Sequence, residues 1–121
     1  MSTNKYLIII QANQQDMGKA MHGLLYGQDL HEAGMEVEVY FDGAGTQWPN
    51  EFSKPDHIIN PLYKQVMKTG ILKGGCGACA GFFDVEEEVQ QAGLKLVGSE
   101  TNSGHLNFSQ FMKDGFVPII L

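Results

Sequence analysis

The sequence predicts a three-layer α/β domain: a mostly parallel five-stranded sheet with helices on both faces. Along residues 1–121, apolar segments of strand length alternate with segments of helical periodicity. The run at 5–11, KYLIIIQ, is continuously apolar, as expected of a central strand covered on both faces. Strands and helices that alternate in this way are joined by right-handed crossovers, which make neighbouring strands parallel. We therefore treat residues 1–121 as a single domain.

The first half of the chain contains two expected strands and one long helix. After the strand at 5–11, Asp16 is placed to cap a helix whose apolar residues recur at helical spacing until Gly34 stops it. The segment 35–41 is rich in valine and aromatic residues and is typical of a second strand. Residues 42–59 hold glycines and prolines without a sustained period. We expect a long connection there, and such loops are more often functional or interfacial than idle.

The second half is expected to contain three helices, each followed by a strand. Asn60, followed by proline, marks a helix start, and a short strand beginning at Ile71 runs into the cysteine segment. Asp84 and Glu87 have the spacing of a capping box for the next helix. The remaining elements are a strand at 94–97, a helix capped by Asn102 or Ser103, and a final strand at 116–121. Pro118 places that final strand at a sheet edge, because proline cannot donate to a central ladder.

Composition excludes several classes of function. The net charge is −6, and all eight cationic residues are lysines. Nucleic-acid sites need a basic surface and favour arginine, so we exclude nucleic-acid binding. No stretch approaches the roughly 20 apolar residues that span a membrane, and the N-terminal apolar run is too short for a signal peptide. Two cysteines make no disulfide framework, so we expect a reducing, cytoplasmic setting.

The segment GILKGGCGACAGFFD holds both cysteines of the chain, Cys76 and Cys79. They follow the third expected strand, and sites in open parallel sheets gather beyond the carboxyl ends of strands. The surrounding glycines add no bulk and leave backbone N–H groups free to face an anion, a setting that lowers a thiol pKa. We therefore expect an activated cysteine, with the sulfur of Cys76 ionised and reachable from water. The alternative is a pair of buried cysteines that act as small hydrophobic residues.

Three chemistries fit the Cys-x-x-Cys spacing. The first is a thiol–disulfide switch, although the thioredoxin-like motif follows the first strand rather than the third. The second is a metal or iron–sulfur site, which a second subunit or a histidine such as His57 or His105 would have to complete. The third is nucleophilic transfer of a sulfur atom. We expect no cofactor, because the dinucleotide-like run Gly75-x-Gly77-x-x-Ala80 has too little sheet after it for two nucleotide-binding halves.

The whole chain resembles the DsrE/DsrF-like family, which includes the TusD-type sulfur carriers. The resemblance rests on the opening strand with its long helix, the extended loop after the second strand, and the segment from Cys76 to Cys79 at a strand end. It implies an intracellular sulfur relay through a cysteine persulfide, with protein donors and acceptors and a homotrimeric or homohexameric assembly. By position, Cys76 matches the sulfur-accepting cysteine and Cys79 an additional one. Phe83 and Asp84 stand where the family commonly has an Arg-Gly pair.

Several further residues are candidates for auxiliary roles. Asp42 is placed to orient a base or a lysine, or simply to form an Asp-Gly turn. Lys73 is a candidate for lowering the thiol pKa, and His105 for moving a proton to or from sulfur, unless it faces solvent at a helix start. Trp48 is expected either at an interface or in internal packing. Against the sulfurtransferase hypothesis stand a non-catalytic oligomeric module that holds a metal through the two cysteines and a redox switch.

Overall fold

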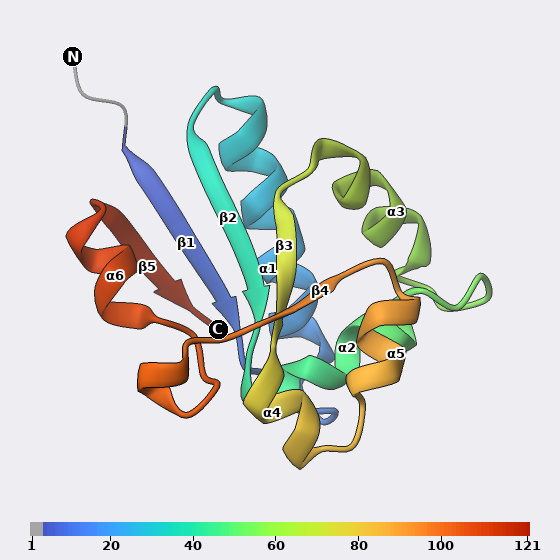
Figure 1. Ribbon diagram of the computed structural model, residues 1–121. Coiled ribbons are helices and arrows are strands. Elements are labelled where there is room, and N and C mark those ends of the chain that lie inside the picture. The colour runs from blue at the N-terminus through green and yellow to red at the C-terminus, as the bar shows by residue number, and fades with distance from the viewer. Residues whose placement is uncertain (1–3) are drawn as a thin grey trace.

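The computed structural model describes residues 4–121, coloured along the chain in Figure 1. The strands are β1 (Lys5–Ile10), β2 (Glu36–Phe41), β3 (Leu72–Cys76), β4 (Lys95–Val97) and β5 (Phe116–Ile120). The helices are α1 (Met17–Glu32), α2 (Trp48–Phe52), α3 (Asn60–Thr69), α4 (Gly77–Phe82), α5 (Glu86–Gln91) and α6 (Phe108–Lys113), with 3-10 turns η1 (Gly43–Gln47) and η2 (Glu100–Asn102). Between residues 4 and 121, no helix has both the length and the apolar character needed to cross a membrane.

The five strands form one parallel sheet in the order β4-β3-β2-β1-β5. This confirms the predicted fold class, a mostly parallel sheet between helical layers. The sheet edges are β4 and β5, and Pro118 lies in β5 opposite Leu7 of β1. The prediction that the proline-containing strand lies at an edge is therefore confirmed. Because all strands point the same way, their carboxyl ends meet at one end of the sheet (Figure 1).

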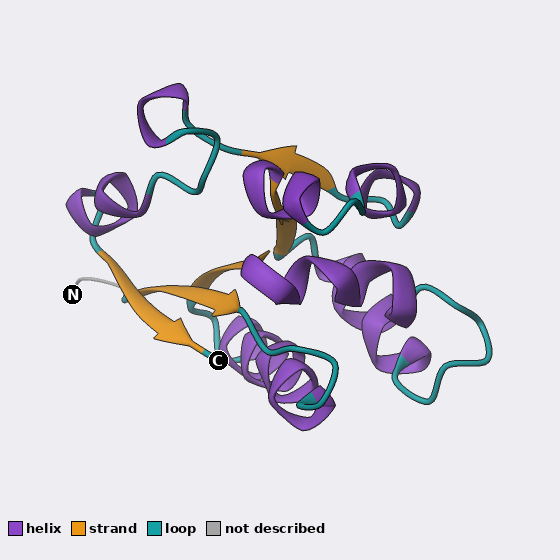
Figure 2. Cartoon of the chain, turned by 90° about the horizontal axis from the view of Figure 1, so that it is seen from below, coloured by secondary structure: helices purple, strands orange, loops and turns teal. Residues whose placement is uncertain are grey.

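Helices pack on both faces of the sheet, and the two cores differ in size (Figure 2). The larger core joins β-strand residues such as Ile8, Val39 and Phe41 to residues of α1, α2, α3 and α5. The smaller core contains six buried residues, Leu7, Ile9, Tyr40, Cys76, Leu106 and Phe116. It is closed by side chains of α6 and by the segment that precedes this helix. One of the two cysteines thus belongs to the smaller core.

Two helix boundaries agree with the sequence, but the expected caps do not form. Helix α1 follows Asp16, whose side chain makes no capping hydrogen bond and instead lies 3.4 Å from the ammonium of Lys19. Gly34, at φ 85°, follows its end as expected. Helix α3 begins at Asn60, but the buried amide of Asn60 donates to the carbonyl of Phe52 at 2.8 Å. The Asn60 side chain therefore links α3 to α2 rather than capping its own helix.

Two other capping predictions were wrong. Asp84 has φ 56° and closes the turn after α4, so α5 begins at Glu86 without an Asp84–Glu87 capping box. Helix α6 begins at Phe108, later than expected. Asn102 instead ends the turn η2, and its side-chain amide donates to the carbonyl of Leu106 at 2.7 Å. In both places a local turn uses the polar residue that the sequence pattern assigned to a helix cap.

The long connection expected at 42–59 contains the turn η1 and the helix α2. Trp48 begins α2 and is 4% exposed, with its indole N–H donating to the carbonyl of Ala12 at 2.7 Å. Its ring stacks on Phe52 at 5.0 Å between centroids. Trp48 therefore packs inside this chain, which decides between the two roles considered for it. A five-residue helix is too short to give the sequence a helical period, which explains why it was not predicted.

Candidate functional site: a cysteine–histidine cluster

Both cysteines lie where β3 turns directly into α4. Cys76 is the last residue of β3 and the N-cap of α4, and Cys79 follows one turn later. The backbone N–H of Cys79 points at the Cys76 sulfur, 3.5 Å away. A Cβ at Gly74 would clash with the Lys95 carbonyl, so glycine there lets β3 lie close to β4 just before the turn. The two sulfur atoms are therefore held on the same side of the turn.

His105 approaches the two thiols from a separate loop. Its Nδ1 lies 3.6 Å from the Cys76 sulfur and 3.6 Å from the Cys79 sulfur. The loop is fixed by backbone hydrogen bonds, from Ser99 N–H to the His105 carbonyl at 2.9 Å and from Ala78 N–H to the Gly104 carbonyl at 3.2 Å. The second of these bonds joins the loop to α4. His105 is an auxiliary candidate from the sequence, and the structure brings it into contact with both cysteines.

Asp42 reaches the cluster from the end of β2. Its Oδ1 accepts from the Cys79 thiol at 3.6 Å, and its Oδ2 accepts from the side-chain amide of Gln11 at 2.8 Å. Gln11 follows β1, which neighbours β2 in the sheet. The Asp42 carboxylate is thus oriented between a thiol and an amide. Asp42 is among the candidates expected from the sequence and Gln11 is not, although Gln11 follows the carboxyl end of the first strand, where such sites form.

The two thiols differ in their access to solvent. Cys76 is 0% exposed and packs in the smaller core, whereas Cys79 is half-buried and His105 is exposed. This contradicts the expectation that the Cys76 sulfur is reachable from water. The reason is that β3 is an inner strand, so its last side chain is covered by the segment around Leu106. Cys79, on the first turn of α4, is the accessible thiol.

The electrostatic setting of Cys79 favours the neutral thiol. Burial raises the pKa of Cys79 to about 12, assisted by its hydrogen bond to Cys76 and by the negative charge of Asp42. The backbone of Gly43 opposes this by hydrogen bonding to the sulfur. The expected lowering of the pKa is therefore wrong for Cys79. Its ionisation requires a base at the site, and the imidazole of His105 lies 3.6 Å from the sulfur.

Two residues considered from the sequence lie away from the cluster. Lys73 is exposed and precedes Cys76 by three strand residues, a separation of about 10 Å at the rise of a strand. His57 lies between α2 and α3, where its Nδ1 accepts from Ile59 N–H at 3.0 Å and its ring contacts Phe52. Neither residue belongs to the group of Cys76, Cys79 and His105, whose potential ligand atoms lie within 4.8 Å of one another.

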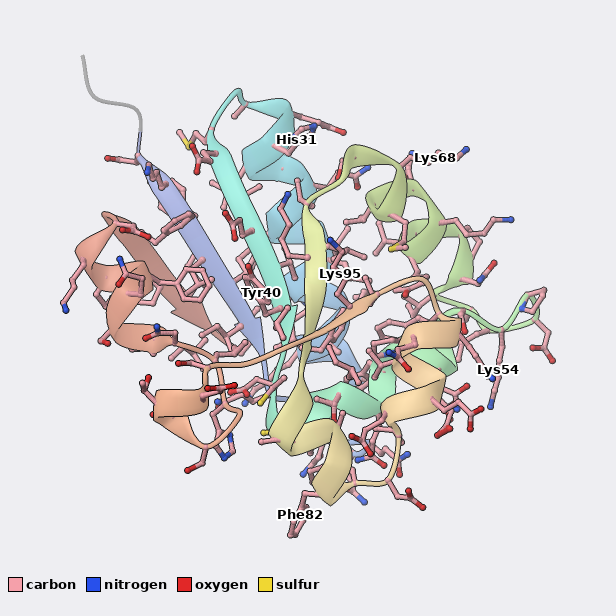
Figure 3. The ribbon with its side chains drawn as sticks, in the orientation of Figure 1. His31, Tyr40, Lys54, Lys68, Phe82 and Lys95 are labelled. Carbon is pink, nitrogen blue, oxygen red and sulfur yellow. The ribbon has the colours of Figure 1, made fainter. Side chains whose placement is uncertain are left out.

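An open groove of about 460 Å³ adjoins the cluster on the side of β4. Ala78, next to the cysteines, and Gly104, next to His105, line one part of it. Glu86 and Glu100 add two carboxylates. On the outside of α4, Phe82 is 83% exposed and points into solvent (Figure 3). The surroundings of the cysteines thus combine an acidic groove with one exposed aromatic ring.

The comparisons with known proteins agree with the fold. No family model matches the sequence. An uncharacterized protein of Methanocaldococcus jannaschii is 28% identical over 104 residues, which cover 86% of this chain and 81% of that protein. The structure of a conserved protein of unknown function from Bacteroides thetaiotaomicron matches 97% of this chain and 95% of its own, with a TM-score of 0.66 and 16% identity. This chain is therefore similar in fold to that protein. In this chain, the cysteine–histidine cluster lies at the carboxyl end of the sheet.

Proposed function

We propose that this protein is a cytoplasmic sulfur-relay protein of the DsrE/DsrF-like kind, which accepts and donates sulfane sulfur as a cysteine persulfide. The observation that carries the proposal is the position of His105, whose Nδ1 lies 3.6 Å from both thiols. One imidazole can therefore exchange protons with either sulfur. General acid–base groups must lie within hydrogen-bonding reach of the proton that they move, and this imidazole meets that condition for both cysteines.

Cys79 is the sulfur-accepting residue in this proposal. A carrier must meet its donor, and Cys79 is half-buried at the surface whereas Cys76 is buried. The family resemblance favours Cys76 for this role, but a buried thiol cannot approach a second protein. Cys76 then acts as the resolving thiol, directly behind Cys79. Both sulfurs and the His105 nitrogen lie within 4.8 Å of one another, so the resolving step needs little movement.

Acceptance of sulfur begins with the loss of the Cys79 proton to His105. The Cys79 sulfur attacks the outer sulfur of a donor persulfide, R–S–SH, and the donor S–S bond breaks. The products are Cys79–S–SH and the donor thiolate, which takes the proton back from the imidazolium. Delivery is the same reaction in reverse, with an acceptor thiolate attacking the outer sulfur. Because His105 is neutral before and after each transfer, it acts as a proton carrier and not as a reactant.

The persulfide sulfur can also be released as hydrogen sulfide through a reaction with Cys76. The Cys76 thiol attacks the inner sulfur of Cys79–S–SH, forms the Cys76–Cys79 disulfide and releases hydrogen sulfide. A cellular thiol must then reduce the disulfide before the next cycle. The N–H of Cys79 that points at the Cys76 sulfur stabilises negative charge on Cys76 during the attack. Persulfide stored on Cys79 is thus either passed to a partner or released.

The partners in this proposal are protein donors and acceptors that dock beside α4. Phe82 is 83% exposed and lies three residues after Cys79, on the same side of the helix. An exposed aromatic ring next to a reactive thiol suits a transient protein contact. Self-association as a trimer or hexamer, which the family resemblance implies, is supported by the uncovered edge of β5, where Val117 and Ile120 are exposed.

Intact-mass measurement after incubation with a small persulfide donor tests the proposal. We expect the reduced wild-type protein to gain one sulfur atom, and Cys79→Ser to gain none. Cys76→Ser, which lacks the resolving thiol, should retain its added sulfur longer than the wild type. Equal sulfur gain in wild type and Cys79→Ser would contradict the assignment of Cys79. No gain in the wild type would contradict the relay itself.

A further inference from the structure

We propose that Cys76, Cys79 and His105 form a Zn²⁺ site contained within one subunit, with an open fourth coordination position. This inference goes beyond the sulfur relay and does not rest on it. It also differs from a metal shared between subunits, because the third ligand comes from the same chain. In the part of the chain that the structure describes, these three residues form the one such group, with ligand atoms mutually within 4.8 Å.

The two sulfur–nitrogen distances match tetrahedral zinc. Zn–S bonds are about 2.3 Å and Zn–N bonds about 2.0–2.1 Å, so a tetrahedral angle separates sulfur from nitrogen by about 3.5–3.6 Å. Nδ1 of His105 lies 3.6 Å from the sulfur of Cys76 and 3.6 Å from that of Cys79. A nitrogen equally distant from two sulfurs is what a shared ion requires.

The ligands are held in place by three different parts of the fold. Cys76 is buried at the end of β3, and Cys79 lies on the first turn of α4. His105 is fixed by the hydrogen bond between its carbonyl and Ser99 N–H, and the neighbouring Gly104 carbonyl accepts from Ala78 N–H. These hydrogen bonds join backbone atoms of this chain and use none of the three ligand atoms. Little ordering is needed on binding, which favours affinity.

The chemistry of the ligands selects the type of metal. Two thiolates and one imidazole suit zinc, whereas calcium and magnesium prefer oxygen ligands. Two thiolates also neutralise a divalent ion, so the centre carries no net charge. Asp42 lies 3.6 Å from the Cys79 sulfur and is held by Gln11, outside the group of three ligands. The fourth position is therefore left for water or a small ligand, the arrangement of reactive rather than structural zinc sites.

Titration of the reduced, metal-free full-length protein with Zn²⁺ alone tests the site. We expect one zinc per chain by calorimetry, and we expect Co²⁺ to give the thiolate charge-transfer and visible bands of a tetrahedral sulfur site. His105→Ala should weaken zinc binding by more than about 100-fold, beyond the losses typical of outer-shell changes. His57→Ala is the matched control, since His57 lies outside the cluster, and should leave zinc binding unchanged.

The outcomes separate this site from its alternatives. One zinc per two or more chains would overturn a site within one subunit, as would equal affinity in wild type and His105→Ala. No zinc binding by the wild type would overturn the site altogether. His105 is exposed, so His105→Ala removes little packing and its effect reports on zinc binding rather than on folding. No persulfide is present in this titration, so failure of the sulfur relay leaves its result unaffected.

Discussion

At the scale of single residues, two cysteines three positions apart have different chemical environments. Cys76 ends an inner strand and is buried by the smaller core, while Cys79 lies on the next helical turn and meets solvent. His105 contacts both sulfurs, but Asp42 contacts Cys79 alone among them. Burial, and to a smaller extent the Asp42 carboxylate, disfavour the Cys79 thiolate, so the resting thiol is protected from indiscriminate reaction. Reactivity then depends on His105 and on the arriving partner.

The pH dependence of alkylation reports this protection. Because burial raises the pKa of Cys79 to about 12, less thiolate exists at neutral pH than for a free cysteine, and its fraction grows tenfold per pH unit up to that pKa. We expect iodoacetamide to modify Cys79 in native, metal-free protein at least about tenfold more slowly than glutathione at pH 7.5. The rate should still be rising at pH 10, as measured by peptide mass spectrometry. A rate that levels off below pH 8 would show a thiolate already present.

Loss of the His105 imidazole should slow sulfur acceptance without unfolding the protein. His105 is exposed, so His105→Ala removes little packing, whereas general acid–base groups typically contribute about 10²–10⁴-fold to rates. We expect sulfur uptake from a small persulfide to fall within that range, with partial rescue by added imidazole. His31→Ala serves as the control, because His31 lies in the last turn of α1 and does not belong to the cluster. Unchanged uptake in His105→Ala would leave the imidazole without a role in transfer.

At the scale of elements, the loop between β4 and α6 positions the histidine. Gly98 begins this loop, and a Cβ there would clash with the carbonyl of Gly104. That same carbonyl accepts from Ala78 N–H and lies 4.0 Å from the Cys76 sulfur. The loop thus approaches α4 as closely as it does because residue 98 has no side chain. The position of His105 depends on this close approach.

Gly98→Ala should therefore displace His105 from the thiols. We expect a loss of about 1–3 kcal/mol in the free energy of unfolding, as for overpacking, together with a large loss of sulfur uptake. Gly18→Ala is the matched control, because nothing lies within 4 Å of its added Cβ and alanine favours a helix by up to about 1 kcal/mol. Urea unfolding measures the first effect, and the NMR signals of the His105 ring measure the displacement. An undisturbed ring in Gly98→Ala would contradict this account.

The elements also show which parts of the site a sequence can predict. Strand periodicity placed the cysteines and Asp42 at the carboxyl edge, because parallel strands bring their ends together. The place of His105 depends on hydrogen bonds within an irregular loop, which leave no period in the sequence. The capping box failed because Asp84 adopts a left-handed conformation that aspartate tolerates in turns. The burial of Cys76 follows from packing by distant residues such as Leu106, which local patterns do not report.

At the scale of the whole molecule, the larger core contains most of the buried side chains, and the smaller core contains the buried cysteine. The cysteine cluster lies at the end of the smaller core, under a single short helix and its loop. The larger core, on the opposite face, joins α1, α2, α3 and α5 to the sheet. Tyr63 is 3% exposed in that core, and its hydroxyl links α3 to the end of α5 by donating to the Ala92 carbonyl at 3.1 Å. A change at Tyr63 therefore tests the stabilising face and leaves the cluster untouched.

Tyr63 should make the stability of the domain fall at alkaline pH. Burial raises its pKa from 10.0 to about 12, so between these values the unfolded chain loses the proton while the native state keeps it. The contribution of Tyr63 to the free energy of unfolding is then constant below pH 10 and declines by roughly 2–3 kcal/mol towards pH 12. Tyr63→Phe should lose about 1 kcal/mol at pH 8 with the hydrogen bond, but decline less steeply above pH 10.

Urea unfolding at a series of pH values measures the difference. Tyr26→Phe, which changes a tyrosine that is 46% exposed, controls for effects common to any loss of a phenol. Tyr40 and Cys79, whose pKa values are also raised by burial, contribute to the decline in all variants and cancel in the comparison. Parallel pH profiles for wild type and Tyr63→Phe would show that Tyr63 ionises equally in both states. The hydroxyl would then be open to water, and the larger core would not exclude solvent between α3 and α5.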